Sequence, residues 1–287
     1  MSVEFSAMQH QRPALPDFQR PPVIEVSLSV QYEPLSQLRT PHLGLFWESI
    51  RDHFPVIQEQ PPLAPVIEVM GLPPDQEGGM RVELLKVPPV PRCWFMSKDG
   101  SELLQVQQDR FISNWRKTAR EMDYPRYEHV RDMFFENFRL YEEFVNKEKL
   151  GDIIPNQCEV TYVNHIPAGE TWTNPGQLGK VFTVWTPTYS DEFLSDPEDV
   201  KFAIRYAIPG EAQGSVIGRL HISLEPKYSA DGSLMFVMIL TARGLPGAPN
   251  AEGVQQFFDL GRKWIVRGFT SITTQQLHEF WGRNDCR

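Results

Sequence analysis

His221-Ile-Ser223 is the part of the sequence that comes closest to a catalytic motif. Two His-x-Ser/Thr units that face each other across a cleft can hold a cyclic phosphate, with one imidazole acting as base and the other as acid. None of the other histidines has Ser or Thr two residues later, so the second unit is missing. A phosphoester or nucleotide-processing enzyme that uses His221 with Arg110 or Arg219 stays an alternative to a histidine that packs on a sheet.

Other motifs for catalysis or metal binding are incomplete. His278-Glu279 is similar to the start of a zinc-protease helix, but Gly282 stands where the second histidine ligand belongs. The sequence contains no Gly-x-Ser-x-Gly elbow, phosphate-binding glycine loop or dinucleotide fingerprint. Cys158 and His165 lie seven residues apart on one expected strand, so they point to opposite faces. We therefore assign no catalytic residue and expect neither a metal nor a cofactor.

Polar and charged residues are concentrated on two stretches that we expect to be neighbouring strands, 104–116 and 158–166. Its candidate binding residues are Asp109, Arg110, Asn114, Trp115, Arg116, Asn164 and His165. Arginine offers bidentate donors and asparagine offers both donor and acceptor, which favours a surface for an anion or a peptide. Trp94 and Trp115 could form its apolar floor. The alternative is a buried Asp–Arg–Asn network that only holds the sheet together, since buried charges need partners.

Charge and cysteine content restrict the class of protein. Acidic residues outnumber basic ones by 37 to 28, which argues against nucleic acid as the main partner. The three cysteines, Cys93, Cys158 and Cys286, are far apart and lack Cys-x-x-Cys spacing, so neither a disulfide framework nor a zinc site is indicated. The N-terminus lacks a signal-peptide pattern, and the longest apolar runs are too short to span a membrane. We expect a cytoplasmic protein with no membrane contact.

The first half of the chain predicts alternating strands and helices. The expected elements are a strand at 24–30, a helix at 41–54, a hairpin of 93–96 and 102–115 with a bulge near 107–109, a helix at 126–149 and a strand at 158–166. This β-α-β-β-α-β order is typical of a ferredoxin-like unit. We place that half at residues 21–166, after a mobile leader at 1–20.

The proline-rich stretch 55–92 contains a local echo. Ala64-Pro-Val-Ile-Glu-Val69 repeats most of Arg20-Pro-Pro-Val-Ile-Glu-Val26. One echo of six residues is too short to indicate a structural repeat. We interpret it as two strands that are each entered through proline.

The second half predicts a different arrangement. Glycine and proline residues at 167–180 indicate a connector. After it we expect strands at 200–208, 218–224 and 234–241 and a helix at 252–269. The predicted fold class is α+β, in which residues 181–287 form a curved antiparallel sheet packed on a long C-terminal helix.

Four segments together carry a resemblance to a known family: Pro-Val-Ile-Glu-Val at 22–26, Leu-Gln-Val-Gln-Gln-Asp-Arg-Phe-Ile-Ser-Asn-Trp-Arg at 104–116, Tyr-Val-Asn-His-Ile at 162–166 and Leu-His-Glu-Phe-Trp-Gly at 277–282. Their order resembles an uncharacterised bacterial family known mainly for its sporadic distribution among genomes. The resemblance covers about residues 21 to 282. It implies a bacterial accessory protein, is compatible with defence or mobile-element biology, and assigns no catalytic residue.

These observations favour a non-enzymatic binding or assembly protein that acts through protein–protein contacts. The missing catalytic constellation, the proline-rich connector and the aromatic content of eighteen Phe, eight Tyr and seven Trp all support it. Strand edges or the C-terminal helix would be available to a protein partner or to a second copy in a homodimer. The alternatives are the phosphoester or nucleotide-processing enzyme and a sensor that binds a small anionic ligand through its arginines.

Overall fold

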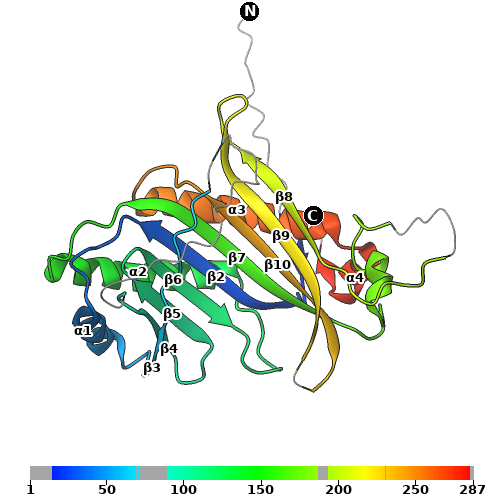
Figure 1. The fold of residues 1–287 in the computed structure, drawn as a ribbon, viewed down its shortest axis with the longest axis horizontal. Coiled ribbons are helices and arrows are strands. Elements are labelled where there is room, and N and C mark those ends of the chain that lie inside the picture. The colour runs from blue at the N-terminus through cyan, green and yellow to red at the C-terminus, as the bar shows by residue number, and fades with distance from the viewer. Residues whose placement is uncertain (1–14, 69, 71–88, 187–192, 230, 285–287) are drawn as a thin grey trace, which may run out of the picture.

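One antiparallel sheet connects both halves of the chain. The computed structural model describes residues 15–68, 70, 89–186, 193–229 and 231–284. Its main sheet has the strand order β3-β4-β5-β6-β2-β7-β10-β9-β8 (Figure 1). The strands are β2 (Val23–Tyr32), β3 (Val56–Gln60), β4 (Arg92–Met96), β5 (Glu102–Gln107), β6 (Arg110–Arg116), β7 (Pro155–Pro167), β8 (Phe202–Pro209), β9 (Val216–Tyr228) and β10 (Leu234–Gly244).

The long helices lie on one face of this sheet (Figure 1). The helices are α1 (Thr40–Ile50), α2 (Tyr127–Lys147), α3 (Ala251–Ile272) and α4 (Gln275–Phe280), with a 3-10 helix at Pro175–Lys180. Asn250 caps the N-terminus of α3, and its side chain accepts a hydrogen bond from the Gly253 amide at 2.9 Å. Helix α2 packs on β6 and β2, and α3 packs on β10 and β7.

Aromatic rings join the sheet to both long helices. Phe134 on α2 lies 5.6 Å from Phe111 on β6 and 4.9 Å from Phe258 on α3, measured between ring centroids. All three side chains are buried. Every second side chain along the strands, for example Leu28 on β2 and Val160 on β7, also points into this core. The helix-covered face therefore contains the hydrophobic core of the described chain.

The predicted α+β class is confirmed: a large antiparallel sheet carries a long C-terminal helix. The ferredoxin-like half is not confirmed, because four strands rather than two lie between α1 and α2. The expected long arm at 102–115 turns back at Gln108 and Asp109, so that Gln107 of β5 faces Arg110 of β6. A tight turn thus replaces the bulge expected near residues 107–109 and adds a strand.

The sheet is continuous across the expected connector at 167–180. Strand β7, before the connector, pairs with β10, after it, from Cys158↔Gly244 to Pro167↔Met235. Helix α3 also packs on β7. Strands from 21–166 and 181–287 therefore share one sheet and one covering helix, and the division of the chain at 167–180 stays a prediction.

The expected mobile leader at 1–20 is ordered at its end. Residues 1–14 lie outside the described residues. Strand β1 (Asp17–Phe18) pairs with β11 (Arg283–Asn284) in a second, two-stranded sheet. Phe18 also packs against Phe269 and Trp281. Within the described chain, none of the helices has the length and apolar character needed to cross a membrane.

Candidate functional site

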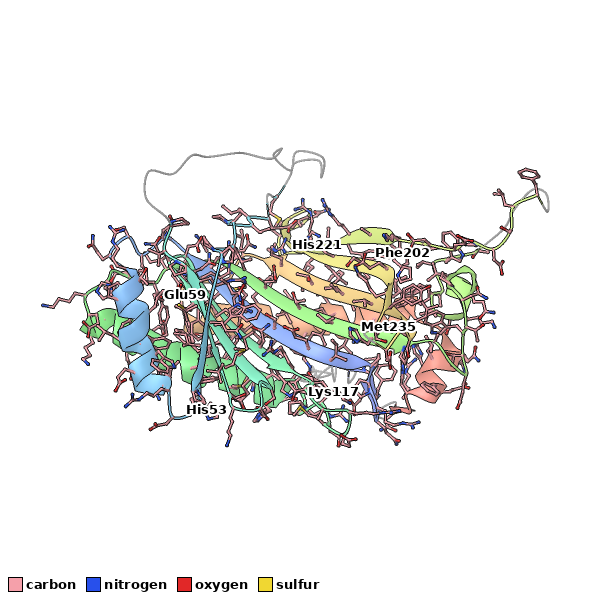
Figure 2. The ribbon with its side chains drawn as sticks, turned by 60° about the horizontal axis from the view of Figure 1, so that its bottom comes forward. His53, Glu59, Lys117, Phe202, His221 and Met235 are labelled. Atoms are coloured by element: carbon pink, nitrogen blue, oxygen red, sulfur yellow. The ribbon has the colours of Figure 1, made fainter. Side chains whose placement is uncertain are left out.

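The face of the sheet that points away from α2 and α3, here called the open face, has a polar character. On β7, β10 and β9 the side chains of this face are only partly buried, whereas those that alternate with them are buried. The partly buried set includes Thr161, Val163, His165, His221, Ile239 and Thr241. Figure 2 shows these strands with their side chains, with His221 of β9 labelled. This is where a ligand could contact the sheet without opening the core.

Residues Pro61–Glu68, here called the strap, cross the open face without forming a strand. Pro61, Pro62 and Pro65 have no backbone N–H to give to a ladder. This overturns the interpretation of the 64–69 echo as a second strand, as far as residue 68; residue 69 lies outside the described residues. The strap is held by side chains that project from the sheet.

Two glutamines each bind both backbone groups of one strap residue. Gln107 of β5 donates from Nε2 to the Leu63 carbonyl at 3.0 Å and accepts from the Leu63 amide at 3.0 Å. Gln31 of β2 binds the amide and carbonyl of Val66 in the same way, both at 3.1 Å. Each contact replaces the pair of hydrogen bonds that a neighbouring strand would supply.

Two further side chains extend this row of contacts. Arg110 of β6 donates to the Ala64 carbonyl at 3.2 Å, and Gln157 of β7 accepts from the Glu68 amide at 2.9 Å. Contacts with the strap backbone thus come from four consecutive strands of the sheet, β5, β6, β2 and β7.

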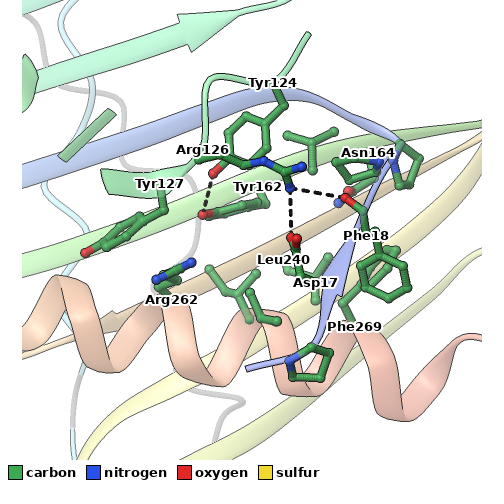
Figure 3. Close-up of a pocket in the computed structure, with 16 residues that line it drawn as sticks. Asp17, Phe18, Tyr124, Arg126, Tyr127, Tyr162, Asn164, Leu240, Arg262 and Phe269 are labelled. Atoms are coloured by element: carbon green, nitrogen blue, oxygen red, sulfur yellow. Dashed lines mark hydrogen bonds and ion pairs between the residues drawn. The ribbon is translucent and has the colours of Figure 1, made fainter. Parts of the chain in front are cut away.

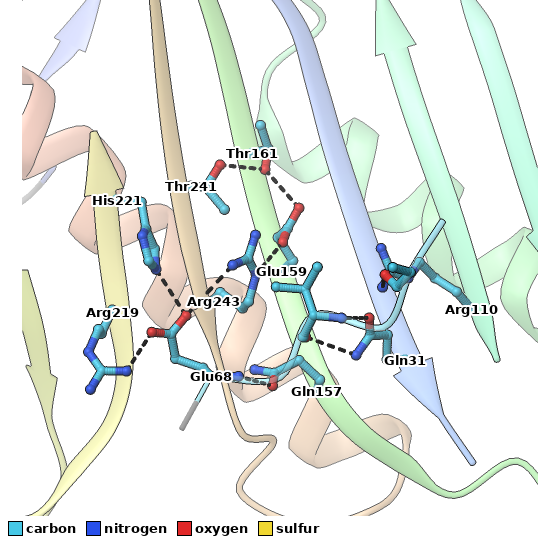
Figure 4. Close-up of polar contacts among 12 residues, drawn as sticks. Gln31, Glu68, Arg110, Gln157, Glu159, Thr161, Arg219, His221, Thr241 and Arg243 are labelled. Carbon is cyan, nitrogen blue, oxygen red and sulfur yellow. Dashed lines mark hydrogen bonds and ion pairs between the residues drawn. The ribbon is translucent and has the colours of Figure 1, made fainter. Parts of the chain in front are cut away.

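The strap ends in a cluster of charged side chains, which Figure 4 shows around Glu68. Glu68 Oε1 accepts a hydrogen bond from Arg219 Nη1 at 2.5 Å. Glu68 Oε2 lies 2.9 Å from His221 Nε2 and 3.7 Å from Arg243 Nη1. Arg243 also bonds Glu159 on β7, with 2.6 Å between Nε and Oε2. We call Arg219, His221 and Arg243 the basic triad.

The register of the sheet explains why the basic triad needs an anion. Arg219 on β9 and Arg243 on β10 are directly opposite each other, and like charges in that position repel. The Glu68 carboxylate lies between them and relieves the repulsion. Its burial raises its pKa, but hydrogen bonds from His221 and Arg219 outweigh this effect and lower the pKa to about 2. Glu68 is therefore held in its charged form.

The structure separates the seven sequence-predicted site residues. Arg110, Asn114 and His165 lie on the open face, but Trp115 and Asn164 point to the helix-covered face. The apolar floor expected from Trp94 and Trp115 does not form. Trp94 bonds Gln105 on the open face, whereas Trp115 packs on Tyr124 beneath the sheet.

The remaining two candidates, Asp109 and Arg116, lie at the ends of β6. Asp109 is in the β5–β6 turn and accepts from Gln107 at 2.5 Å. Arg116 donates to the Gly100 carbonyl at 2.8 Å, in the turn before β5. Of the seven candidates, Arg110 is the one that contacts the strap through its side chain within the described chain.

Asn114 belongs to a separate buried network. It donates to Glu25 at 2.6 Å and accepts from Gln105 at 2.8 Å, and it is 3% exposed. Gln105 in turn accepts from Arg92 and Trp94. For Asn114, the geometry matches the structural alternative, in which polar side chains join neighbouring strands.

Asn164 is one of the residues that line a small pocket under the sheet (Figure 3). Its volume is about 70 Å³, less than the about 150 Å³ that holds a benzene ring. The hydroxyls of Tyr124 and Tyr162 lie 3.0 Å apart in its wall, and Arg126 closes it by bonding Asp17 at 2.8 Å. These polar groups of the wall are thus already paired within the protein, and the pocket is a weaker candidate than the open face.

The described side chains offer little for nucleophilic or metal chemistry. Burial raises the pKa of the Cys93 thiol to about 11 and raises that of Cys158 further, so neither is an activated thiolate. No group of three or more His, Cys, Asp or Glu side chains with metal-binding geometry occurs among the residues that the structure describes. Arg219 and His221 are instead arranged to hold an anion.

Sequence reasoning missed Glu68 and the role of the basic triad. Arg219 and His221 alternate on one expected strand, which indicates a shared face, but their carboxylate lies 151 and 153 residues away in the chain. Comparison with protein-family models gives no match, and comparison with curated proteins also gives none.

Proposed function

We propose that this protein is a non-enzymatic binding protein that acts through protein–protein contacts on its open face. One observation carries the proposal: the open face holds an extended polypeptide segment that is not a strand of the sheet. Gln107, Arg110, Gln31 and Gln157 bond its backbone, and the basic triad binds its carboxylate. Backbone contacts combined with one charged anchor are typical of peptide recognition.

The same cluster favours anion binding over catalysis. His221 Nε2 is engaged by Glu68, and Arg110 bonds the strap rather than His221. A two-histidine phosphoesterase needs a second imidazole. Among the described residues, His221 is the one histidine that contacts Glu68. A sensor of small anions is the second candidate, since Arg219, His221 and Arg243 converge on a single carboxylate.

A cytoplasmic location belongs to the same proposal. The buried cysteines Cys93 and Cys158 are both free thiols, which a reducing compartment preserves. A protein partner, or a second copy of this chain, would therefore meet the open face in the cytoplasm.

Site-specific photo-cross-linking in the native host tests the proposal. A benzophenone amino acid replaces Val163 on the open face in one variant and Leu140 on the exposed side of α2 in the control. We expect ultraviolet light to produce a defined cross-linked protein from the Val163 variant only, identified by mass spectrometry. Cross-links from Leu140 alone, or none from a folded Val163 variant, would overturn the proposal.

A further inference from the structure

We propose that the strap is an intramolecular occupant of a site for an extended acidic polypeptide, and that it must leave for a partner segment to bind. The proposal rests on the function proposed above and specifies its ligand. The partner segment would carry an aspartate or glutamate side chain for the basic triad. Its backbone would take the place of residues 63–68.

The backbone contacts depend little on the side chains of the bound segment. Gln107 and Gln31 each bond one N–H and one C=O of a single strap residue. A side-chain amide offers a donor and an acceptor at once, so it pairs with any residue that has a backbone N–H. These two glutamine contacts therefore suit any extended segment that lacks proline at the positions of Leu63 and Val66.

The strap adds little to the hydrophobic core. Six of its eight residues are exposed, and only Glu68 is buried. Ile67 is 65% exposed and Val66 is 40% exposed, so their side chains contribute little hydrophobic burial. A segment held mainly by polar contacts can open locally while the sheet stays folded.

The charged end of the site sets the chemistry of the ligand. Glu68 is the anion that separates Arg219 from Arg243 directly across the β9–β10 ladder. The same carboxylate contacts all three members of the basic triad, so it is the group that joins the two guanidinium groups and the imidazole. A partner segment must therefore supply an acidic side chain two residues after the residue that binds Gln31.

Two buried donors show that the strap does not use the site fully. Gln157 is 2% exposed and Arg110 is 7% exposed, and both contact the strap. Gln157 Nε2 and Arg110 Nε nevertheless have no hydrogen-bond partner among the described residues. Buried donors are normally paired. A segment with carbonyl oxygens at these two points would bind more completely than the strap does.

Exchange of the strap for an external peptide tests the proposal. In one variant of the full chain, residues 61–68 are replaced by eight alternating glycines and serines. The probe is a fluorescent peptide with the strap sequence Pro-Pro-Leu-Ala-Pro-Val-Ile-Glu and capped ends. We expect it to bind the strap-replaced protein at least about ten-fold more tightly than the wild type, because a tethered segment competes at an effective concentration of about millimolar.

Two control ligands define the specificity. The same peptide with glutamine in place of its glutamate should bind at least about ten-fold more weakly, because it lacks the charge that the basic triad holds. Equal binding of both peptides, or equal binding to wild-type and strap-replaced protein, would overturn the proposal. So would binding of inorganic phosphate without binding of the peptide, since the ligand would then be a small anion.

A single substitution covers the case in which the strap-replaced protein does not fold. In full-length Glu68→Gln, we expect hydrogen exchange at the amides of Leu63 and Val66 to become at least about ten-fold faster, while β7 and β10 stay protected. Unchanged exchange would show that the strap is a fixed part of the fold and would overturn the proposal. Cross-links at Val163 without peptide exchange would leave the proposed function standing with another ligand.

Discussion

The sequence Pro-Val-Ile-Glu occurs twice in this chain, at 22–25 and at 65–68, with two different structures. The first copy enters β2, where it pairs with β6 and β7 at the centre of the sheet. The second copy lies across the open face and is held by side chains. Four identical residues thus adopt a central strand or a strap, depending on what the rest of the chain places beside them.

The pKa values of the two glutamates in these copies, Glu25 and Glu68, also depend on the surrounding residues. Burial raises the pKa of Glu25, and the hydrogen bond from Asn114 only partly opposes it. Burial also acts on Glu68, but His221 and Arg219 outweigh it and lower the pKa to about 2. The burial of Glu25 outweighs its hydrogen bond with Asn114 and its attraction to Arg116, whereas the hydrogen bonds of His221 and Arg219 outweigh the burial of Glu68.

The largest expected effect is a difference in pH dependence between the two copies. Because folding lowers the pKa of Glu68 from 4.5 to about 2, its contribution of about 3 kcal/mol is complete above pH 4.5 and is lost as the pH falls toward 2. Glu25 has the opposite sign, because its raised pKa gives stability below pH 4.5 that is lost as the pH rises through the raised value.

Urea unfolding between pH 2.5 and pH 6, in steps of about half a unit, measures this difference. Glu68→Gln should flatten the acid loss of stability, and Glu25→Gln should steepen it, because Glu25 offsets part of that loss at low pH. The opposite result would show that the strap carboxylate is not the group that responds to acid.

The next effect concerns the same substitutions at neutral pH. Glu68→Gln should lower the free energy of unfolding by about 2 kcal/mol, because Arg219 and Arg243 lose the anion between them. Glu25→Gln should change it by less than about 1 kcal/mol, since an amide keeps an acceptor for Asn114 and removes a buried charge. Denaturant unfolding at pH 7 compares the two variants, and equal losses would refute the contrast.

A smaller effect separates contacts with the strap from contacts within the sheet. Gln31→Ala should cost about 1 kcal/mol in local opening of the strap and little in global stability, because within the described chain the side-chain amide of Gln31 bonds Val66 of the strap. The matched control, Gln105→Ala, removes the partner of Arg92, Trp94 and Asn114 and should destabilise β4, β5 and β6. Hydrogen exchange distinguishes them, and faster exchange across the sheet in Gln31→Ala would contradict this assignment.

The parts of the fold that the sequence predicts are those with a strong local period. Alternation marks β2 from Val23, and an apolar stripe marks α2. The turn at Gln108 and Asp109 interrupts a polar arm that has no glycine or proline, so the arm resembles one long strand. Local pattern therefore identifies the elements but not all of their boundaries.

The candidate site is predictable only in part. Asn114 and Trp115 are neighbours on one strand, so they must point to opposite faces, and this alternation by itself excludes a shared surface. Arg110 bonds the Ala64 carbonyl of the strap, and its role in binding a partner stays a prediction. The pairing of Glu68 with Arg219 is not predictable, because it depends on a strand 151 residues away and on a proline-rich segment without periodicity.

The path of the strap has a consequence for the kinetics of folding. Because its contacts begin on β5 and end on β9, its binding surface exists only after strands from both halves of the chain have paired. Docking of the strap is then a late step that follows the rate-limiting assembly of the sheet. Removal of the Glu68 contacts would speed unfolding and leave the folding rate nearly unchanged.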